Sequence, residues 1–188
     1  VYGGVAGDVM GQDCQEMKGL HDLDETVVDE ELTRAMTPFS QKPGDITALR
    51  NRLQDVMWED VGVMRDADGL QRGLKRIAEI DDELSSVGVA ADNLAFNLSW
   101  HDWLNLRSLI DMSMVIAKAA LSRENSRGAH FREDFPDAGA MQESYFTLAS
   151  GYGDAISVTR APVQFTIVKP GETLLGEDEA ETLIKAAQ

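Results

Sequence analysis

The sequence predicts a mainly α-helical protein, with three amphipathic helices followed by a small β-rich appendage. Two observations carry this prediction. Between residues 45 and 122, apolar residues recur at helical spacing in three segments joined by short connections. After Pro136 the pattern changes to short β-prone runs with glycines between them. The composition agrees, because 43% hydrophobic and 27% charged residues suffice for a buried core.

Residues 1–40 precede the bundle. Val5 and Val9 fit one side of a helix, but the glycines around them weaken that prediction. Residues 24–39 favour a helix, for which Thr26 is the expected cap and Pro38 the expected end.

The first bundle helix is expected to begin at Asp45, a capping residue. The second extends from Ala67 to about residue 86, with Gly88 ending it. The third and longest extends from Asp92 to Ser122 and carries apolar residues on more than one side. Its expected buried residues are Leu94, Leu98, Trp103, Leu106, Ile110, Met114, Ala117 and Leu121. Three such helices with short connections favour an up-down-up bundle like a spectrin repeat.

The appendage is expected to hold three strands, over residues 145–149, 156–159 and 163–168. Gly151, Gly153 and Asp154 indicate a hairpin turn between the first two. Residues 177–188 are expected to form a charged terminal helix. The predicted organisation is therefore a segment with a connecting helix (1–40), a helical bundle (41–140) and a β-hairpin appendage with a tail (141–188).

Charge and residue usage exclude several function classes. A formal net charge of −16 repels phosphate backbones, which argues against nucleic-acid binding. The single cysteine, Cys14, has no internal disulfide partner and is expected to be a small buried residue. This cysteine usage indicates a cytoplasmic protein. His21, His101 and His130 lack metal-ligand spacing, so no metal site is predicted.

A polar cluster follows the third helix. Arg123, Arg127 and Arg132 lie close in sequence to acidic residues, and Gly128 allows a tight exit from the helix. We expect these residues to form a structural clamp at a domain interface. Two alternatives are an anion or substrate site and a wall that stiffens an active site from behind. The candidate residues are Arg123, Glu124, Ser126, Arg127, His130, Arg132 and Asp134.

The stretch from Ser122 to Pro136, Ser-Arg-Glu-Asn-Ser-Arg-Gly-Ala-His-Phe-Arg-Glu-Asp-Phe-Pro, carries a resemblance to a family. It resembles the R-x-E-S-R-G-A-H-x-R-x-D-x-P element of the succinate dehydrogenase and fumarate reductase flavoproteins, which include aspartate oxidases. Asn125 departs from the usual acidic residue. Residues 57–66 resemble the segment between the first two helices of the family's C-terminal domain, and residues 146–163 resemble the β-rich extension of its succinate dehydrogenase and fumarate reductase branch. Residues 1–7 resemble the end of the family's flavin domain, so the resemblance implies that residues 1–40 are the end of that domain and a connecting helix.

The resemblance implies that this chain is the C-terminal part of an FAD-dependent oxidoreductase acting on a small dicarboxylate. The family's flavin-binding and catalytic motifs are absent from this sequence, so we expect no catalytic residue and no cofactor here. The chain also lacks an initiator Met, which favours a piece of a longer protein.

The partners implied by the resemblance are the flavin domain of the same polypeptide and an iron-sulfur electron-transfer subunit, which would place the protein at the cytoplasmic face of a membrane. Self-association of the severed domain is also expected. The alternatives are the same domain of an L-aspartate oxidase and a free-standing protein-interaction module.

Overall fold

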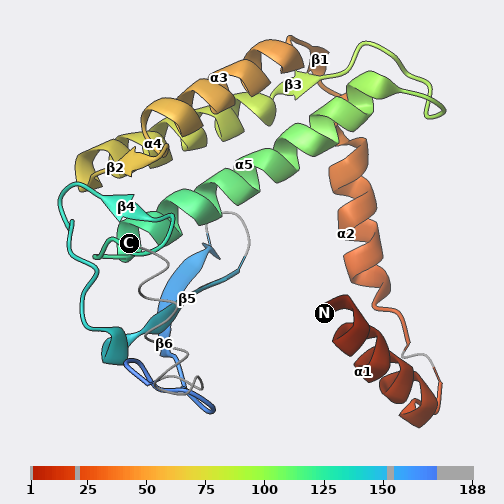
Figure 1. Ribbon diagram of the computed structural model, residues 1–188. Helices are drawn as coiled ribbons and strands as arrows, with labels where there is room; N and C mark the ends of the chain where they lie inside the picture. Colours follow the sequence, from red (N-terminus) through yellow and green to blue (C-terminus); the bar gives the residue numbers. More distant parts are fainter. Residues whose placement is uncertain (1, 20–21, 152–154, 173–188) are drawn as a thin grey trace. The chain divides into compact units, whose positions relative to one another are not determined.

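The computed structural model describes residues 2–19, 22–151 and 155–172 (Figure 1). The chain is mainly helical with a few small strands, as the sequence predicts. It divides into two compact units, Val1–Thr37 and Pro38–Gln188. The division into three segments and the spectrin-repeat-like arrangement of the bundle stay predictions.

The first unit holds two helices, α1 (Tyr2–Glu16) and α2 (Glu25–Met36). α1 is continuous despite its glycines, and neither helix has a buried residue. The carboxylate of Asp24 accepts a 3.0 Å hydrogen bond from the Thr26 amide, so Asp24 is the cap and the prediction of Thr26 was wrong. Extended backbone at Asp24 lets its short side chain reach back to the first turn. Cys14, expected to be buried, is exposed, while His21 lies outside the described residues.

The second unit begins with the end of a 3₁₀ turn, η1 (Thr37–Phe39), and contains the three long helices. These are α3 (Ile46–Glu59), α4 (Ala67–Leu84) and α5 (Leu98–Ser122), and each packs against the other two (Figure 1). Asp45 caps α3 as predicted, accepting a 2.9 Å hydrogen bond from the Ala48 amide. Asp66 caps α4 in the same way, through a 2.7 Å bond from the Gly69 amide.

The long helix α5 begins at Leu98, six residues after the predicted Asp92. Asn97 is the reason: its side-chain oxygen accepts a 3.0 Å hydrogen bond from the Trp100 amide. Its side-chain nitrogen donates to the carbonyl oxygens of Ala91 and Asn93, which ties the preceding loop in a non-helical path.

The core lies between α3, α4 and α5. Each fully buried leucine or isoleucine contributes roughly 1.5–3 kcal/mol relative to an exposed one. Leu94 and Leu98 were wrongly expected to join the core, since they are 56% and 77% exposed. The core residues contributed by these helices are Leu49, Leu53, Val56, Leu70, Ile77, Ile80, Leu84, Trp103, Leu106, Ile110, Ala117 and Ala120.

Two short parallel pairings join the connections between helices. β1 (Lys42–Pro43) pairs with β3 (Val87–Gly88), and β2 (Met64–Arg65) pairs with β4 (Phe131–Arg132). Gly88 therefore belongs to a strand, and the helix that it was expected to end stops at Leu84. The β2–β4 pair places the segment after α5 beside the beginning of α4.

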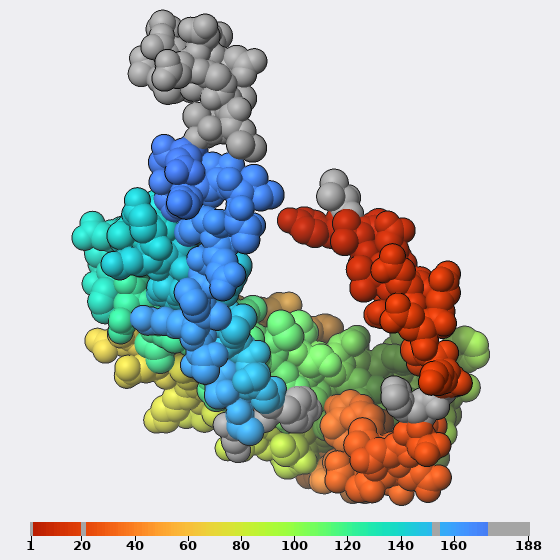
Figure 2. Space-filling view, turned by 90° about the horizontal axis from the view of Figure 1, so that it is seen from below, coloured from red at the N-terminus to blue at the C-terminus, as the bar shows by residue number. Residues whose placement is uncertain are grey.

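The appendage contains η2 (Met141–Glu143) and an antiparallel hairpin of β5 (Tyr145–Ser150) and β6 (Ser157–Pro162). Both strands pack against α5, and Figure 2 shows the hairpin in blue. The predicted third strand was wrong: residues 163–168 are irregular, and Ile167 is 82% exposed. Alternating polarity forms a strand only beside a strand edge and a core. Among the described residues, the Val163 amide is the one backbone group of this segment that bonds back, to the Ser144 carbonyl. Gly153, Asp154 and residues 177–188 lie outside the described part of the chain.

Candidate functional site

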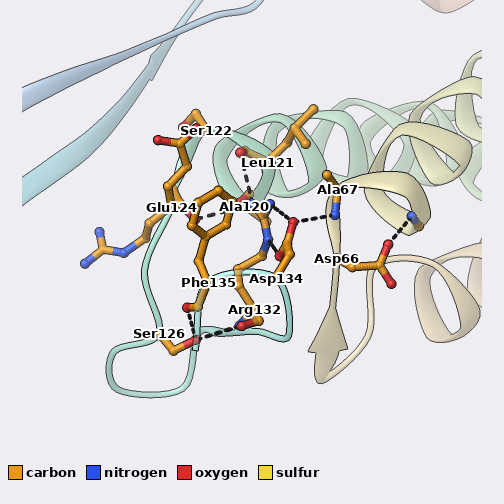
Figure 3. A network of polar contacts seen from close by, with 12 residues as sticks. Asp66, Ala67, Ala120, Leu121, Ser122, Glu124, Ser126, Arg132, Asp134 and Phe135 are labelled. Carbon is orange, nitrogen blue, oxygen red and sulfur yellow. Dashed lines mark hydrogen bonds and ion pairs between the residues drawn. The ribbon is translucent and has the colours of Figure 1, made fainter. Parts of the chain in front are cut away.

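Arg132 is the centre of the polar segment that follows α5. Its side chain is 1% exposed and forms a two-pronged pair with Asp134, with Nε–Oδ1 and Nη2–Oδ2 distances of 2.7 and 2.6 Å (Figure 3). Nη1 donates to the carbonyl oxygens of Ala120 and Leu121, at 2.9 and 3.0 Å. Carbonyl oxygens at the last turn of a helix lack the amide of the next turn, and the Ala120 carbonyl also accepts a 3.3 Å hydrogen bond from the Arg123 amide. The buried guanidinium therefore acts as a C-terminal cap of α5.

Asp134 links this cap to the next helix. Its Oδ2 accepts a 3.0 Å hydrogen bond from the amide of Ala67, the first residue of α4 (Figure 3). The pKa of Asp134 is lowered from 3.8 to about 2, chiefly by the hydrogen bond from the Arg132 guanidinium, and the Ala67 amide acts in the same direction. One ion pair therefore joins the end of α5 to the beginning of α4.

Ser126 holds the loop closed around this pair. Its hydroxyl accepts a 2.8 Å hydrogen bond from the Arg132 amide and donates one of 2.8 Å to the Phe135 carbonyl (Figure 3). Its own amide donates to the Asp137 carbonyl at 2.9 Å. Gly128 has a φ of +62°, so the tight turn predicted at this glycine is present.

Arg127 fastens the same loop to the segment before β5. Its guanidinium donates to the carbonyl oxygens of Ala138 and Ala140 and to the Ser144 hydroxyl, over 2.6–3.1 Å. Its amide and carbonyl exchange hydrogen bonds with those of His130. All these partners are neutral, so the positive charge of Arg127 is held in place without a counterion among them.

Glu124 and Arg123 lie at the edge of the segment. Glu124 is exposed, and its carboxylate is 3.6 Å from Arg160. Arg123 donates to the Asn125 side-chain oxygen at 3.2 Å, and its guanidinium carbon lies 5.1 Å from the centre of the Tyr145 ring. Asn125, the departure from the family pattern, is buried and satisfies Arg123 without supplying charge.

His130 connects the segment to Arg65. The Arg65 Nη1 donates to His130 Nδ1 at 3.0 Å, and His130 Nε2 lies 3.2 Å from the Arg123 carbonyl. Because an arginine cannot accept, this geometry requires a neutral imidazole with its proton on Nε2. Burial lowers the pKa of His130, and the charges of Arg65, Arg123 and Arg132 add to this effect.

These side chains border an open hollow of about 450 Å³, which we call the arginine hollow. Its lining combines cationic and neutral polar groups with small apolar ones. The lining residues are Arg65, Ile116, Ala119, Ala120, Arg123, Arg127, Ala129, His130 and Thr147.

The candidate residues thus fall into two groups. Ser126, Arg132 and Asp134 point into the segment and hold it, whereas Arg123, Arg127 and His130 border the hollow. Sequence reasoning missed Arg65, which meets His130 across 65 positions of the chain. The signal available was its place in the family-like stretch of residues 57–66.

The glycines at the beginning of the chain and the metal-binding side chains bear on cofactor binding. Gly3, Gly4, Gly7 and Gly11 lie inside α1 and not at a strand-to-helix turn, so they form no cradle for a dinucleotide. No group of three or more metal-binding side chains gathers within the described ranges. No described helix is long and apolar enough to cross a membrane.

Comparison with known proteins places these features among flavoproteins. The family described as "Fumarate reductase flavoprotein C-term" matches residues 50–174. An uncharacterized FAD-dependent oxidoreductase from Methanocaldococcus jannaschii is 31% identical over 135 residues, which cover 71% of this chain and 24% of that protein. L-aspartate oxidase 1 from Ralstonia nicotianae is 38% identical over 86 residues, or 46% of this chain and 15% of that protein.

A solved structure agrees in fold. Mycobacterium smegmatis Sdh1 in complex with UQ1 superposes with a TM-score of 0.72 at 27% identity, covering 91% of this chain and 29% of that one. The chain therefore spans about a quarter of the length of the first of these relatives.

Proposed function

The chain belongs to the family of fumarate reductase flavoprotein C-terminal domains, and from this premise we propose that it is the helical supporting domain of an FAD-dependent flavoprotein of the succinate dehydrogenase and fumarate reductase type. It packs against the flavin domain of the same polypeptide and performs no catalysis alone. FAD, held by other parts of that protein, supplies the electron transfer. The helices α3, α4 and α5 are proposed to form a spectrin-repeat-like bundle in this role.

A second apolar side of α5 carries the proposal. Leu109, Met112 and Ile116 follow one another at helical spacing and are 45%, 55% and 42% exposed. Another side of α5 packs in the core through Leu106 and Ile110. A helix that is apolar on two sides is stabilised by two partners, and an exposed apolar stripe of this kind is typical of an interface.

The arginine-rich segment continues this stripe, because Ile116 borders the arginine hollow. We propose that Ser126, Arg132 and Asp134 keep the segment rigid by holding α4, α5 and the loop together. Arg123, Glu124, Arg127 and His130 are then presented toward the flavin domain. In this proposal the first three residues form the structural clamp, and the other four form the interface.

The partners of the whole protein follow from the same proposal. An iron-sulfur subunit accepts or donates the electrons, and partner subunits hold the protein at the cytoplasmic face of a membrane. An L-aspartate oxidase is the second candidate for the whole protein, favoured by the 38% identity over 86 residues. A free-standing interaction module is the third, and the same apolar stripe is the feature that would serve it.

The first test is a titration of the purified chain with FAD, followed by a fumarate reduction assay. We expect neither flavin binding nor turnover, because the described residues form no dinucleotide cradle. Tight binding or turnover would overturn the proposal that the chain is only a supporting domain.

The second test places the double change Leu109→Gln and Met112→Gln in a full-length flavoprotein that carries this chain. We expect a lower melting temperature and faster loss of FAD, because polar side chains weaken an apolar contact. Ser108→Gln is the matched control: it adds the same side chain at an exposed position of α5 beside the stripe, without removing an apolar group. A double variant that behaves like the control would contradict docking through this side of α5.

A further inference from the structure

We propose that the arginine hollow is a binding site for a carboxylate carried on a short apolar chain. Arg65 and Arg123 would hold the carboxylate, and Ile116 with its neighbouring alanines would contact the apolar chain. A free organic acid and a glutamate or aspartate side chain of a docked protein share this chemistry. The inference rests on side chains of this chain and goes beyond its proposed supporting role.

The arrangement of charge is the first argument. Arg65, Arg123 and Arg127 all border the hollow, and none has a carboxylate within ion-pair distance among the described residues. This is unusual in a chain with a formal net charge of −16. Every other arginine has an acidic partner, namely Arg34, Arg50, Arg52, Arg72, Arg76, Arg107, Arg132 and Arg160. The uncompensated arginines are thus gathered at one place.

The unused donors are the second argument. Arg65 uses Nε on the carbonyls of Val61 and Gly62 and Nη1 on His130, and within the described residues its Nη2 makes no hydrogen bond. Arg123 likewise uses Nε on Asn125 and Nη1 on Thr147, which leaves its Nη2. Guanidinium N–H groups are strong donors to carboxylates, and these two are already fixed in position by neutral partners.

The lining favours an organic anion over an inorganic one. Ile116, Ala119, Ala120 and Ala129 supply apolar surface beside the cations. A phosphate or sulfate ion gains nothing from such surface, whereas the methylene groups of an organic acid do. A volume of about 450 Å³ has room for a small acid or one acidic side chain.

His130 provides a reporter inside the site. The positive groups that face it are Arg65 from β2, Arg123 from the end of α5 and Arg132 from β4, and their charges, together with burial, lower its pKa. A bound carboxylate would offset these charges, so the pKa of His130 should rise on binding.

The experiment is an NMR titration of the histidine resonances of the full chain. Sodium propionate is the free-acid probe, a capped Ala-Glu-Ala tripeptide is the side-chain probe, and sodium phosphate is the inorganic probe, all at constant ionic strength. We expect propionate or the tripeptide to shift the His130 resonance and raise its pKa, with His101 unchanged. The tighter of these two probes identifies the source of the carboxylate.

Three variants test the assignment. Arg123→Gln and Arg65→Gln should each raise the Kd of the organic probe about tenfold, the expected effect of losing one charged hydrogen bond. Arg52→Gln, which breaks a pair with Glu83 away from the hollow, is the control and should leave Kd unchanged. Thermal unfolding of each variant shows whether it is folded, and two hollow variants are used in case one is not.

The proposal is overturned if no organic probe shifts His130, if phosphate binds as tightly as propionate, or if Arg52→Gln weakens binding as much as the hollow variants. The docking of α5 on the flavin domain is tested separately, through the variants at Leu109 and Met112. If the α5 variants behave like their control, the proposal of carboxylate binding in the arginine hollow is not affected. The two proposals can therefore fail independently.

Discussion

At the scale of single residues, Arg132 connects three parts of the fold. It is fully buried, pairs with Asp134 and caps the last carbonyls of α5. A buried charge is stable only when each of its donors has a partner, and here the partners come from a loop and a helix end. The sequence placed Arg132 and Asp134 two positions apart, but the carbonyls that complete the site became known only from the fold.

Replacing the Arg132 side chain should destabilise the protein strongly. We expect Arg132→Met to reduce the free energy of unfolding by about 3–5 kcal/mol, because it leaves Asp134 and the end of α5 without their partner. Urea unfolding followed by circular dichroism measures this loss. The control is Arg52→Met, whose half-exposed pair with Glu83 should contribute no more than about 1 kcal/mol. Equal losses of free energy in the two variants would show that the buried Arg132 stabilises the protein no more than an exposed arginine does.

Asp134 predicts an acid dependence of stability. Its folded pKa of about 2 lies below the ordinary 3.8, so the folded state favours the ionised form. This contribution is fully present above pH 3.8 and is lost as the pH falls toward 2. We expect Asp134→Asn to be about 1 kcal/mol less stable than the parent near neutral pH, after allowing for solvent screening of a partly exposed side chain.

The measurement for Asp134 is urea unfolding at a series of pH values. The gap between parent and variant should close as the pH approaches 2. Asp82→Asn, an exposed change on α4, is the control and should run parallel to the parent. A gap that stays constant with pH would contradict the predicted linkage.

His130 predicts a second loss of stability at low pH, which arises from a buried neutral imidazole and not from an ionised carboxylate. Burial lowers its pKa below the ordinary 6.5, and the charge of Arg65 adds to this. Protonation is therefore harder in the folded state, and stability falls as the pH drops below 6.5 through the folded pKa. NMR titration should give a pKa below 6.5 for His130, rising in Arg65→Gln. A pKa above 6.5 in the unliganded chain would contradict the predicted effect of burial and of the neighbouring arginines.

At the scale of elements, short pairings decide where the helices stop. Gly88 lies in β3, and a Cβ atom built there would come within 2.3 Å of the Pro38 carbonyl oxygen and 2.4 Å of that of Gln41. Only glycine allows this close approach of two backbones. The β1–β3 pairing therefore depends on a residue that the sequence pattern assigned to a helix end.

Gly88→Ala should separate β1 from β3. Because the obstructing atoms are backbone oxygens, we expect a loss of about 1–3 kcal/mol or more in the free energy of unfolding. The matched control is Gly69→Ala on α4, where the nearest atoms lie at an ordinary 3.4–3.5 Å and alanine favours the helix. Thermal unfolding of both variants measures the difference. A stable Gly88→Ala protein would show that the strand pair can move aside without loss.

At the scale of the whole molecule, exposed apolar side chains predict association. The stripe of Leu109, Met112 and Ile116 is expected to cause concentration-dependent self-association when no flavin domain covers it. Light scattering at increasing concentration measures this for the chain and for Met112→Gln, which should shift toward monomer, with Ser108→Gln as the control. A monomer at every concentration would contradict this expectation.

What the sequence determined by itself was the local part of the structure. Periodic apolar residues predicted α3 and α4 closely, Asp45 was correctly identified as a cap, and the family was identified from the segment after α5. Such signals depend on neighbours within a few positions, so they can be found without the fold. The glycine turn at Gly128 belongs to the same class.

What only the tertiary structure decided was every feature that joins distant positions. Asn97 delayed the start of α5 through bonds to the preceding loop, and residues 163–168 formed no strand because they found no edge to pair with. Apolar residues on two sides of α5 predicted burial, yet one side is exposed. Above all, Arg65 reaches His130 across 65 positions. Contacts of this kind arise when the three helices pack together. The pattern of residues along the sequence does not indicate which distant side chains this packing brings into contact.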